Sequence, residues 1–188
     1  MTAPKAIHFT GNAEADELLA ADPFALLVGF ALDQQVTVPT AFMGPLKLKQ
    51  RLGHLDPKRI AELSPDQLEA VFREKPAVHR FPGSMAKRVR ELAATISDDY
   101  DGHADELWTT AKSSSELEGR IRALPGFGDM KVVGLGSTLA KRLNVKLAAP
   151  LVPDHPCLGD VDSPEALEAY QSAKRAKKAA ARAVGAEP

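Results

Sequence analysis

Prolines and glycines divide this chain into short segments whose apolar residues recur at helical spacing. A helix-capping residue directly precedes proline in three places, at Asp56-Pro57, Ser64-Pro65 and Ser163-Pro164. Proline suits the first turn of a helix because its φ angle is already helical and its missing N–H needs no partner there. Aromatic and β-branched residues do not alternate as strands require. The pattern predicts an all-α fold.

Apolar stripes with the spacing of one helix face run through residues 24–32, 89–96 and 117–124. Such stripes form the buried side of helices that pack on a common core. We expect roughly eight to ten short helices, each ending where proline or glycine interrupts the pattern. The expected breaks lie near Pro39, Gly53, Pro76, Pro82, Gly102, Pro125 and Pro150.

Two serines mark helix starts by a second signal. Ser64 with Gln67, and Ser115 with Glu118, have the spacing of a capping box, in which each side chain satisfies a free amide of the first turn. The stretch 144–162 is different, because its three prolines and a glycine interrupt any helical register. It predicts a long irregular connection, and connections of that length are usually functional or disordered.

Composition excludes several classes of protein. The 188 residues are enough to bury a core without disulfides or metal. The single cysteine, Cys157, permits neither a disulfide nor a four-thiolate cluster within the chain, and the five histidines lack metal-ligand spacing. The longest apolar run, residues 24–32, is too short to cross a bilayer, and residues 1–9 hold no signal core. We therefore expect a cytoplasmic protein without cofactor or metal.

The most informative segment is a helix, a tight glycine turn and a second helix within residues 115–143. The turn reads Leu124-Pro125-Gly126-Phe127-Gly128. Its two glycines can adopt backbone angles closed to other residues, and they leave no side chain between the peptide N–H groups and an approaching ligand. Phe127 between them is expected to point into the core.

The second helix is expected to begin at Asp129 or Met130. Its first N–H groups have no partner within the helix and carry the positive end of the helix dipole. A phosphate is the natural ligand of such a site. Lys131, in the same first turn, could add a charge-assisted contact.

This hairpin resembles the helix-hairpin-helix motif of DNA glycosylases, the HhH-GPD superfamily, and the resemblance extends over residues 24–143. Leu32-Asp33-Gln34-Gln35 is similar to the end of the family's early helix, whose last glutamine reaches into the duplex. The segment 81–89 is similar to the helix before the hairpin. The resemblance implies a two-lobed helical fold that binds duplex DNA. The implied DNA-binding residues are Gln34, Gln35, Lys87, Arg88, Gly126, Phe127, Gly128 and Lys131, and Arg90 would lie beside the duplex.

The resemblance also implies that a damaged base is flipped out of the duplex between the two lobes. Aromatic side chains on which it could stack are Phe81, His79, Tyr100 and Trp108.

In the family an aspartate stabilises the cationic sugar and orients the attacking water. Its place in this chain falls on residues 147–149, which hold no acid. Downstream, Asp154 is the first candidate and Asp162 the second, although Asp162 could simply assist the Ser163 helix start.

Some members of the family use a lysine to cleave the DNA strand as well. That lysine's place is taken here by Met130, and Lys131 follows one residue later. A helix turns about 100° per residue, so Lys131 is aimed elsewhere. The resemblance therefore implies a monofunctional DNA N-glycosylase of base excision repair, acting as a monomer on damaged duplex DNA.

We expect one helical domain over residues 1–162, with its hairpin motif at 115–143, and a basic C-terminal helix or tail over 163–188. Two other functions stay open: a catalytically inactive module that senses lesions, favoured by the missing acid, and a helical protein-interaction domain in which the hairpin is only a turn. The tail suggests an anionic partner, although solubilising helices have similar charge. Its basic residues are Lys174, Arg175, Lys177, Lys178 and Arg182.

Overall fold

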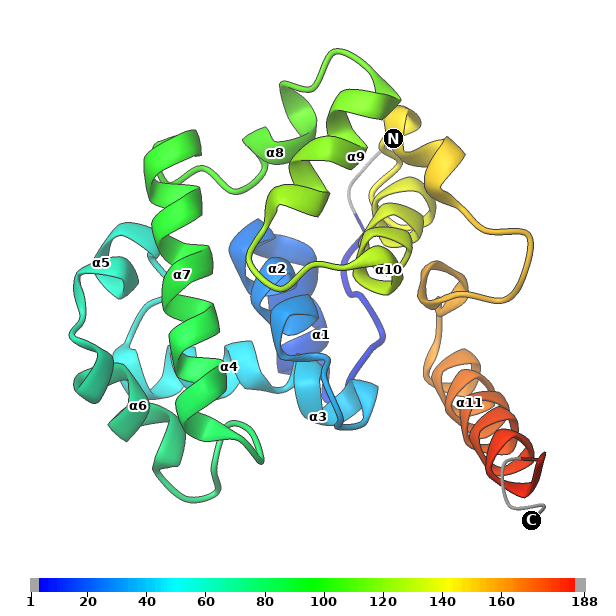
Figure 1. Ribbon diagram of the computed structural model, residues 1–188, viewed down its shortest axis with the longest axis horizontal. Helices are drawn as coiled ribbons and strands as arrows, with labels where there is room; N and C mark the ends of the chain where they lie inside the picture. Colours follow the sequence, from blue (N-terminus) through cyan, green and yellow to red (C-terminus); the bar gives the residue numbers. More distant parts are fainter. Residues whose placement is uncertain (1–3, 185–188) are drawn as a thin grey trace.

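The computed structural model describes residues 4–184, with side chains described as far as residue 181. Within that range it holds eleven α-helices, two 3₁₀-helices and no strand, which confirms the predicted all-α fold (Figure 1). The α-helices are α1 (Ala13–Ala21), α2 (Pro23–Leu32), α3 (Val38–Phe42), α4 (Gly44–Leu52), α5 (Pro57–Glu62), α6 (Pro65–Arg73), α7 (Pro82–Tyr100), α8 (Glu106–Thr109), α9 (Ser114–Ala123), α10 (Asp129–Lys141) and α11 (Pro164–Val184). The 3₁₀-helices are η1 (Lys146–Leu151) and η2 (Leu158–Asp160).

The expected number of helices was too low because some elements are too short to carry a periodic stripe. Helix α3 has five residues and α8 has four, so neither spans two turns. The connection predicted to be irregular, residues 144–162, contains the short 3₁₀-helices η1 and η2; Pro150 lies within η1, and Pro153 and Pro156 lie in the loop between the two.

The predicted helix caps are confirmed in three of four places. The side chains of Asp56, Ser64 and Ser163 each accept a hydrogen bond from an amide in the first turn of the helix that follows, and Ser64 forms the full capping box with Gln67. The Ser115 prediction is wrong. Helix α9 begins two residues earlier, because the hydroxyl of Ser113 accepts the hydrogen bond from the N–H of Glu116 at 3.1 Å.

Helix α2 lies at the centre of the core, and nine of its ten residues are buried. Its Phe30 ring packs edge-to-face against Phe9 and Phe42, with centroid separations of 6.5 and 5.0 Å. Each fully buried ring of this kind contributes about 1.5–3 kcal/mol of hydrophobic stabilisation. This central helix is therefore held firmly, which fixes the position of the polar residues at its C-terminal end.

Helices α1, α3 and α4 pack on α2, and two further groups of helices lie on either side of it (Figure 1). In the first group, α5 and α6 pack against the long helix α7. In the second, α9, η1 and η2 pack around α10. Helix α2 contacts α7 directly, and a Cβ atom on Gly134 of α10 would lie 3.1 Å from the Phe30 ring. The two-lobed arrangement thus brings the C-terminal end of α2 between α7 and α10.

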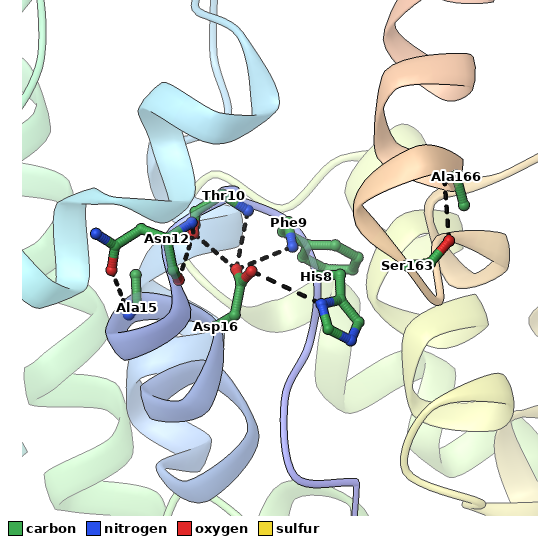
Figure 2. Close-up of polar contacts among 8 residues, drawn as sticks. All are labelled: His8, Phe9, Thr10, Asn12, Ala15, Asp16, Ser163 and Ala166. Atoms are coloured by element: carbon green, nitrogen blue, oxygen red, sulfur yellow. Dashed lines mark hydrogen bonds and ion pairs between the residues drawn. The ribbon is translucent and has the colours of Figure 1, made fainter.

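The segment before α1 is fastened to the core by one buried carboxylate (Figure 2). Asp16, 4% exposed, accepts hydrogen bonds from the N–H groups of Phe9 and Thr10 at 3.1 and 2.9 Å. The Thr10 hydroxyl donates to the same oxygen at 2.7 Å, and a ring nitrogen of His8 lies 3.9 Å from the other. These bonds satisfy a carboxylate that burial would otherwise destabilise, and they hold Phe9 in the aromatic cluster.

Helix α11 starts on the body of the protein and then leaves it (Figure 1). The Ser163 hydroxyl caps its first turn, accepting from the N–H of Ala166 at 3.2 Å. Leu167 is buried and Tyr170 packs against the core, while residues 172–181 are exposed. Among the helices of residues 4–184, none combines the length and apolar character needed to cross a membrane.

Candidate DNA interface

The glycine turn between α9 and α10 matches the sequence prediction at Gly126 and Phe127, whereas Gly128, with a φ angle of −89°, adopts an extended backbone that any residue can adopt. Gly126 adopts a φ angle of +77°, a left-handed conformation that favours glycine. Phe127 turns inward and is only 4% exposed, and its N–H donates to the carbonyl of Leu124 at 3.1 Å. The turn therefore rests on a buried aromatic anchor, while its two glycines stay at the surface.

The start of α10 is open to solvent. Gly128 is the N-cap residue, no side chain caps the helix, and a Cβ atom placed on Gly128 would meet no atom within 4 Å. Gly128, Asp129 and Met130 are all exposed, and their N–H groups have no acceptor among the described residues. The free amides and the positive end of the α10 dipole thus face outward, an arrangement that binds a phosphate oxygen.

Arg88 of α7 connects the turn with the glutamines that follow α2. A Cβ atom on Gly126 would lie 2.6 Å from the Arg88 Nε, so the guanidinium packs directly on the glycine backbone. The same guanidinium donates a hydrogen bond to the Gln34 side-chain oxygen. The structure therefore brings together three of the predicted DNA-binding residues from three separate segments.

The other predicted DNA-binding residues occupy different settings. Gln35 is exposed and adopts a positive φ angle of 56°. Lys87 is also exposed, with its ammonium 3.8 Å from Glu91 on the next turn of α7. The Arg90 side chain is held within the protein, because its Nε donates to the carbonyl of Leu63 at 2.7 Å. Arg90 therefore joins α7 to the segment after α5 within its own lobe.

Lys131 turns toward the protein, not away from it. Its ammonium donates to the carbonyl of Ala31 at 3.0 Å and lies 5.5 Å from the centre of the Phe127 ring. Burial and, to a smaller extent, the positive charge of Arg88 lower the pKa of Lys131 to about 8, against the opposing effect of Asp33. Lys131 thus joins the start of α10 to the C-terminal end of α2 while keeping its charge at neutral pH.

Sequence reasoning missed Asp33, which stands immediately before the two glutamines. It is half-buried, and burial raises the pKa of its carboxyl, although Lys174 of α11 and Lys131 both act to lower it. No periodicity distinguishes this aspartate from an ordinary helix-ending residue. Its only sequence signal is its place beside Gln34, in the segment that ends the central helix.

The two candidate catalytic aspartates lie in the connection between α10 and α11. Asp154 is fully exposed in the loop between η1 and η2, and its Oδ1 lies 3.3 Å from the Nδ1 of His155. Asp162 is exposed just before the Ser163 cap of α11. Neither carboxylate contacts the glycine turn, Gln34 or Lys131 within the described residues, so their catalytic role stays a prediction.

The aromatic candidates for base stacking divide by exposure. His79 is 2% exposed; its Nδ1 accepts from the N–H of Phe81 and its Nε2 lies 3.1 Å from the carbonyl of Leu32. Burial lowers the pKa of His79, so the ring is neutral and braces the end of α2. Trp108 is buried and Tyr100 half-buried. Phe81 is 37% exposed and is the most accessible ring of the four.

The position of Lys131 predicts a pH dependence of DNA binding. The ammonium itself turns inward, but the negative charge of a phosphate bound at the start of α10 would stabilise it through space and raise its pKa, so binding takes up a proton above the free pKa of about 8. Affinity should be constant below about pH 7, fall about twofold by pH 8 and fall by up to about tenfold by pH 9–9.5. Fluorescence anisotropy across this range measures it, and the Lys131→Met variant should be weaker but pH-independent. An equal pH dependence in both proteins would contradict this role of the Lys131 charge.

The family model of the HhH-GPD superfamily base excision DNA repair proteins matches residues 28–184. This match covers the end of α2, the glycine turn, both aspartates and α11. The chain therefore belongs to the HhH-GPD superfamily, a family of DNA-binding proteins that act in base excision repair. No curated protein and no solved structure matches the chain significantly.

Proposed function

We propose that this protein is a monofunctional DNA N-glycosylase that binds damaged duplex DNA as a monomer. The observation that carries the proposal is the open start of α10, where three exposed amides face solvent above a buried Phe127. A phosphate bound there would hold the duplex against the loop that contains Gln34 and Gln35. That loop is then in position to occupy the space left by an extruded base.

The residues in the first turn of α10 favour hydrolysis of the glycosidic bond by water. They supply no amine for cleavage of the DNA strand. Met130 occupies the place of the family's lyase lysine and is 86% exposed. Lys131 is turned inward to the carbonyl of Ala31. In the proposed reaction an aspartate accepts a proton from water as the water oxygen bonds to the sugar C1′. The N-glycosidic bond breaks and the base leaves with its electron pair.

We assign the aspartate role to Asp154, with Asp162 as the alternative. Asp154 belongs to the loop between η1 and η2, and its complete exposure leaves the carboxylate open to a docked nucleotide. Asp162 has a competing structural explanation, because it directly precedes the α11 cap and its negative charge favours that helix start.

The second candidate function is a lesion-binding module without catalysis. It is favoured by the segment in which the family's acid would fall, which the chain folds into η1. That segment contains Leu147, Ala148 and Ala149, and Ala148 is fully buried. Such a protein would use the same phosphate contact and glutamine loop but would leave the base attached.

One experiment separates these two functions. The protein is incubated with a panel of duplexes that each contain one altered base, and the products are treated with alkali to cleave any abasic site. We expect cleavage of at least one duplex after alkali, none before it, and no covalent adduct on borohydride reduction. Binding to a lesion without abasic sites in any duplex would contradict the glycosylase and support the sensing module. Adduct formation would contradict the monofunctional mechanism.

A further inference from the structure

Helix α11 separates its charges along its length. Its acidic residues, Glu165 and Glu168, lie in the first two turns, and no acid follows them in the helix. Four basic residues come next, and their described side chains are exposed: Lys174, Arg175, Lys177 and Lys178. None of the four forms an ion pair within the residues that the structure describes, and the side chain of Arg182 lies outside them.

This placement is not explained by the helix dipole. Basic residues that favour a helix end act within its last turn, since the effect falls off beyond it. The helix ends at Val184, whereas Lys174, Lys177 and Lys178 lie between six and ten residues earlier. These three lysines follow Tyr170 by four, seven and eight residues, and residues at such spacings lie on the same side of a helix. That face begins at Tyr170, which packs against the core.

The basic face starts beside the phosphate-binding region. The Lys174 ammonium lies 6.0 Å from the centre of the Tyr170 ring. Burial raises the pKa of Tyr170, and the negative charge of Asp33 raises it further. Asp33 in turn is close enough to both Lys174 and Lys131 for their charges to act on its carboxyl. Helices α10 and α11 therefore both reach the C-terminal end of α2.

From this point α11 extends beyond the body of the protein, as Figure 1 shows. At 1.5 Å per residue, the distance along the helix from Tyr170 to Lys178 is about 12 Å. One strand carries a phosphate for about every 3.4 Å of the duplex axis, so a helix segment of this length lying along that axis passes about three to four phosphates of the strand. The positive charge and the length of the helix therefore fit backbone phosphates next to the phosphate that the glycine turn would bind.

We propose that the basic face of α11, from Lys174 to Lys178, binds backbone phosphates of the duplex on one side of the target nucleotide. The proposal rests on the DNA-binding function proposed above and extends it to a second surface. Since these side chains would contact phosphates only, they raise affinity for any sequence and carry no preference for the lesion.

The test neutralises the two lysines farthest from the body and leaves Lys174 beside Asp33 in place. The double variant Lys177→Gln/Lys178→Gln is compared with Lys112→Gln/Lys146→Gln, in which two exposed lysines of other elements are changed. Both double variants alter the net charge equally and touch no buried residue. Affinity for one long undamaged duplex is measured at several salt concentrations.

We expect the α11 variant to bind more weakly and to have a shallower dependence of log K on log salt. Each lost phosphate contact should lower the slope by about 0.9, so the total change should approach about 2. The Lys112/Lys146 control should keep both the affinity and the slope of the wild type. An α11 variant that also keeps both values would overturn the proposal.

Duplexes shortened from one end or the other provide the second measurement. For the wild type, shortening the duplex on one side of the lesion should reduce affinity to that of the α11 variant. The affinity of the variant should not change when the duplex is shortened on that side. Equal sensitivity on both sides would contradict a one-sided contact. Binding of phosphatidylserine vesicles that depends on Lys177 and Lys178, with unchanged DNA affinity, would assign the face to membranes instead.

The two proposals fail in different ways. If the wild type does not bind duplex DNA at low salt, the DNA-binding function itself is contradicted. If the wild type binds and the start of α10 is required, but the α11 variant is unchanged, only the second surface is wrong.

Discussion

Replacing Gly128 with leucine should leave the protein folded and should weaken its binding to every duplex, damaged or not, about tenfold or more. Tenfold corresponds to about 1.4 kcal/mol of binding free energy. The new side chain has room in the free protein, because a Cβ atom on Gly128 meets nothing within 4 Å. It would occupy the space in which a phosphate approaches the amides of α10. Thermal unfolding and fluorescence anisotropy measure the two quantities separately.

Gly119 offers a matched control in the same hairpin unit. It is exposed in α9, and a Cβ atom there also meets nothing within 4 Å. The Gly119→Leu variant should bind DNA as the wild type does, and its unfolding free energy should rise by up to about 1 kcal/mol because leucine favours a helix. Loss of DNA binding in Gly119→Leu, or its retention in a folded Gly128→Leu, would contradict the proposed contact.

Gly126 is not suitable for this test. A side chain there would collide with the Arg88 guanidinium at 2.6 Å and would have to adopt a φ angle of +77°. Loss of binding in a Gly126 variant would therefore report damage to the turn as well as loss of a phosphate contact. The two glycines are required for different reasons, which only the structure separates.

The second large effect concerns Asp154. With a duplex that the panel identifies as a substrate, Asp154→Asn should slow single-turnover base release about a hundredfold or more, as expected for loss of a general base. Duplex affinity should stay within about twofold of the wild type, because an exposed loop residue is changed without altering its size. Quenched reactions followed by alkaline cleavage measure the rate, and anisotropy measures the affinity.

Asp162→Asn is the comparison for that experiment. It should release the base at the wild-type rate, and any cost should appear in the stability of the α11 start. Wild-type turnover in Asp154→Asn together with its loss in Asp162→Asn would transfer the role to Asp162. Wild-type turnover in both variants would contradict catalysis by either aspartate.

The local features of this protein are largely predictable from its sequence. Capping residues followed by proline identify helix starts because the chemistry lies within one turn, as at Asp56 and Ser64. The turn at residues 124–128 is equally local, since glycine angles and one buried aromatic ring define it. The start of α9 was misplaced because Ser113 and Ser115 both precede a glutamate by three residues, so the pattern allows two caps.

The polar contacts of the candidate site could not be predicted in the same way. Lys131 and Ala31 are 100 residues apart, and Arg88 is 54 residues from Gln34. Helical periodicity identifies the buried faces but does not say which helices become neighbours. Asp33 was missed for this reason: its importance comes from α10 and α11, which converge on the end of α2.

The most direct test of the phosphate contact replaces single phosphates of the bound duplex with uncharged methylphosphonates, one position at a time. For the wild type, one position near the lesion should weaken binding about tenfold. For Gly128→Leu, which has already lost that contact, the same replacement should have no further effect. If no position distinguishes the two proteins, the open amides of α10 do not hold a phosphate.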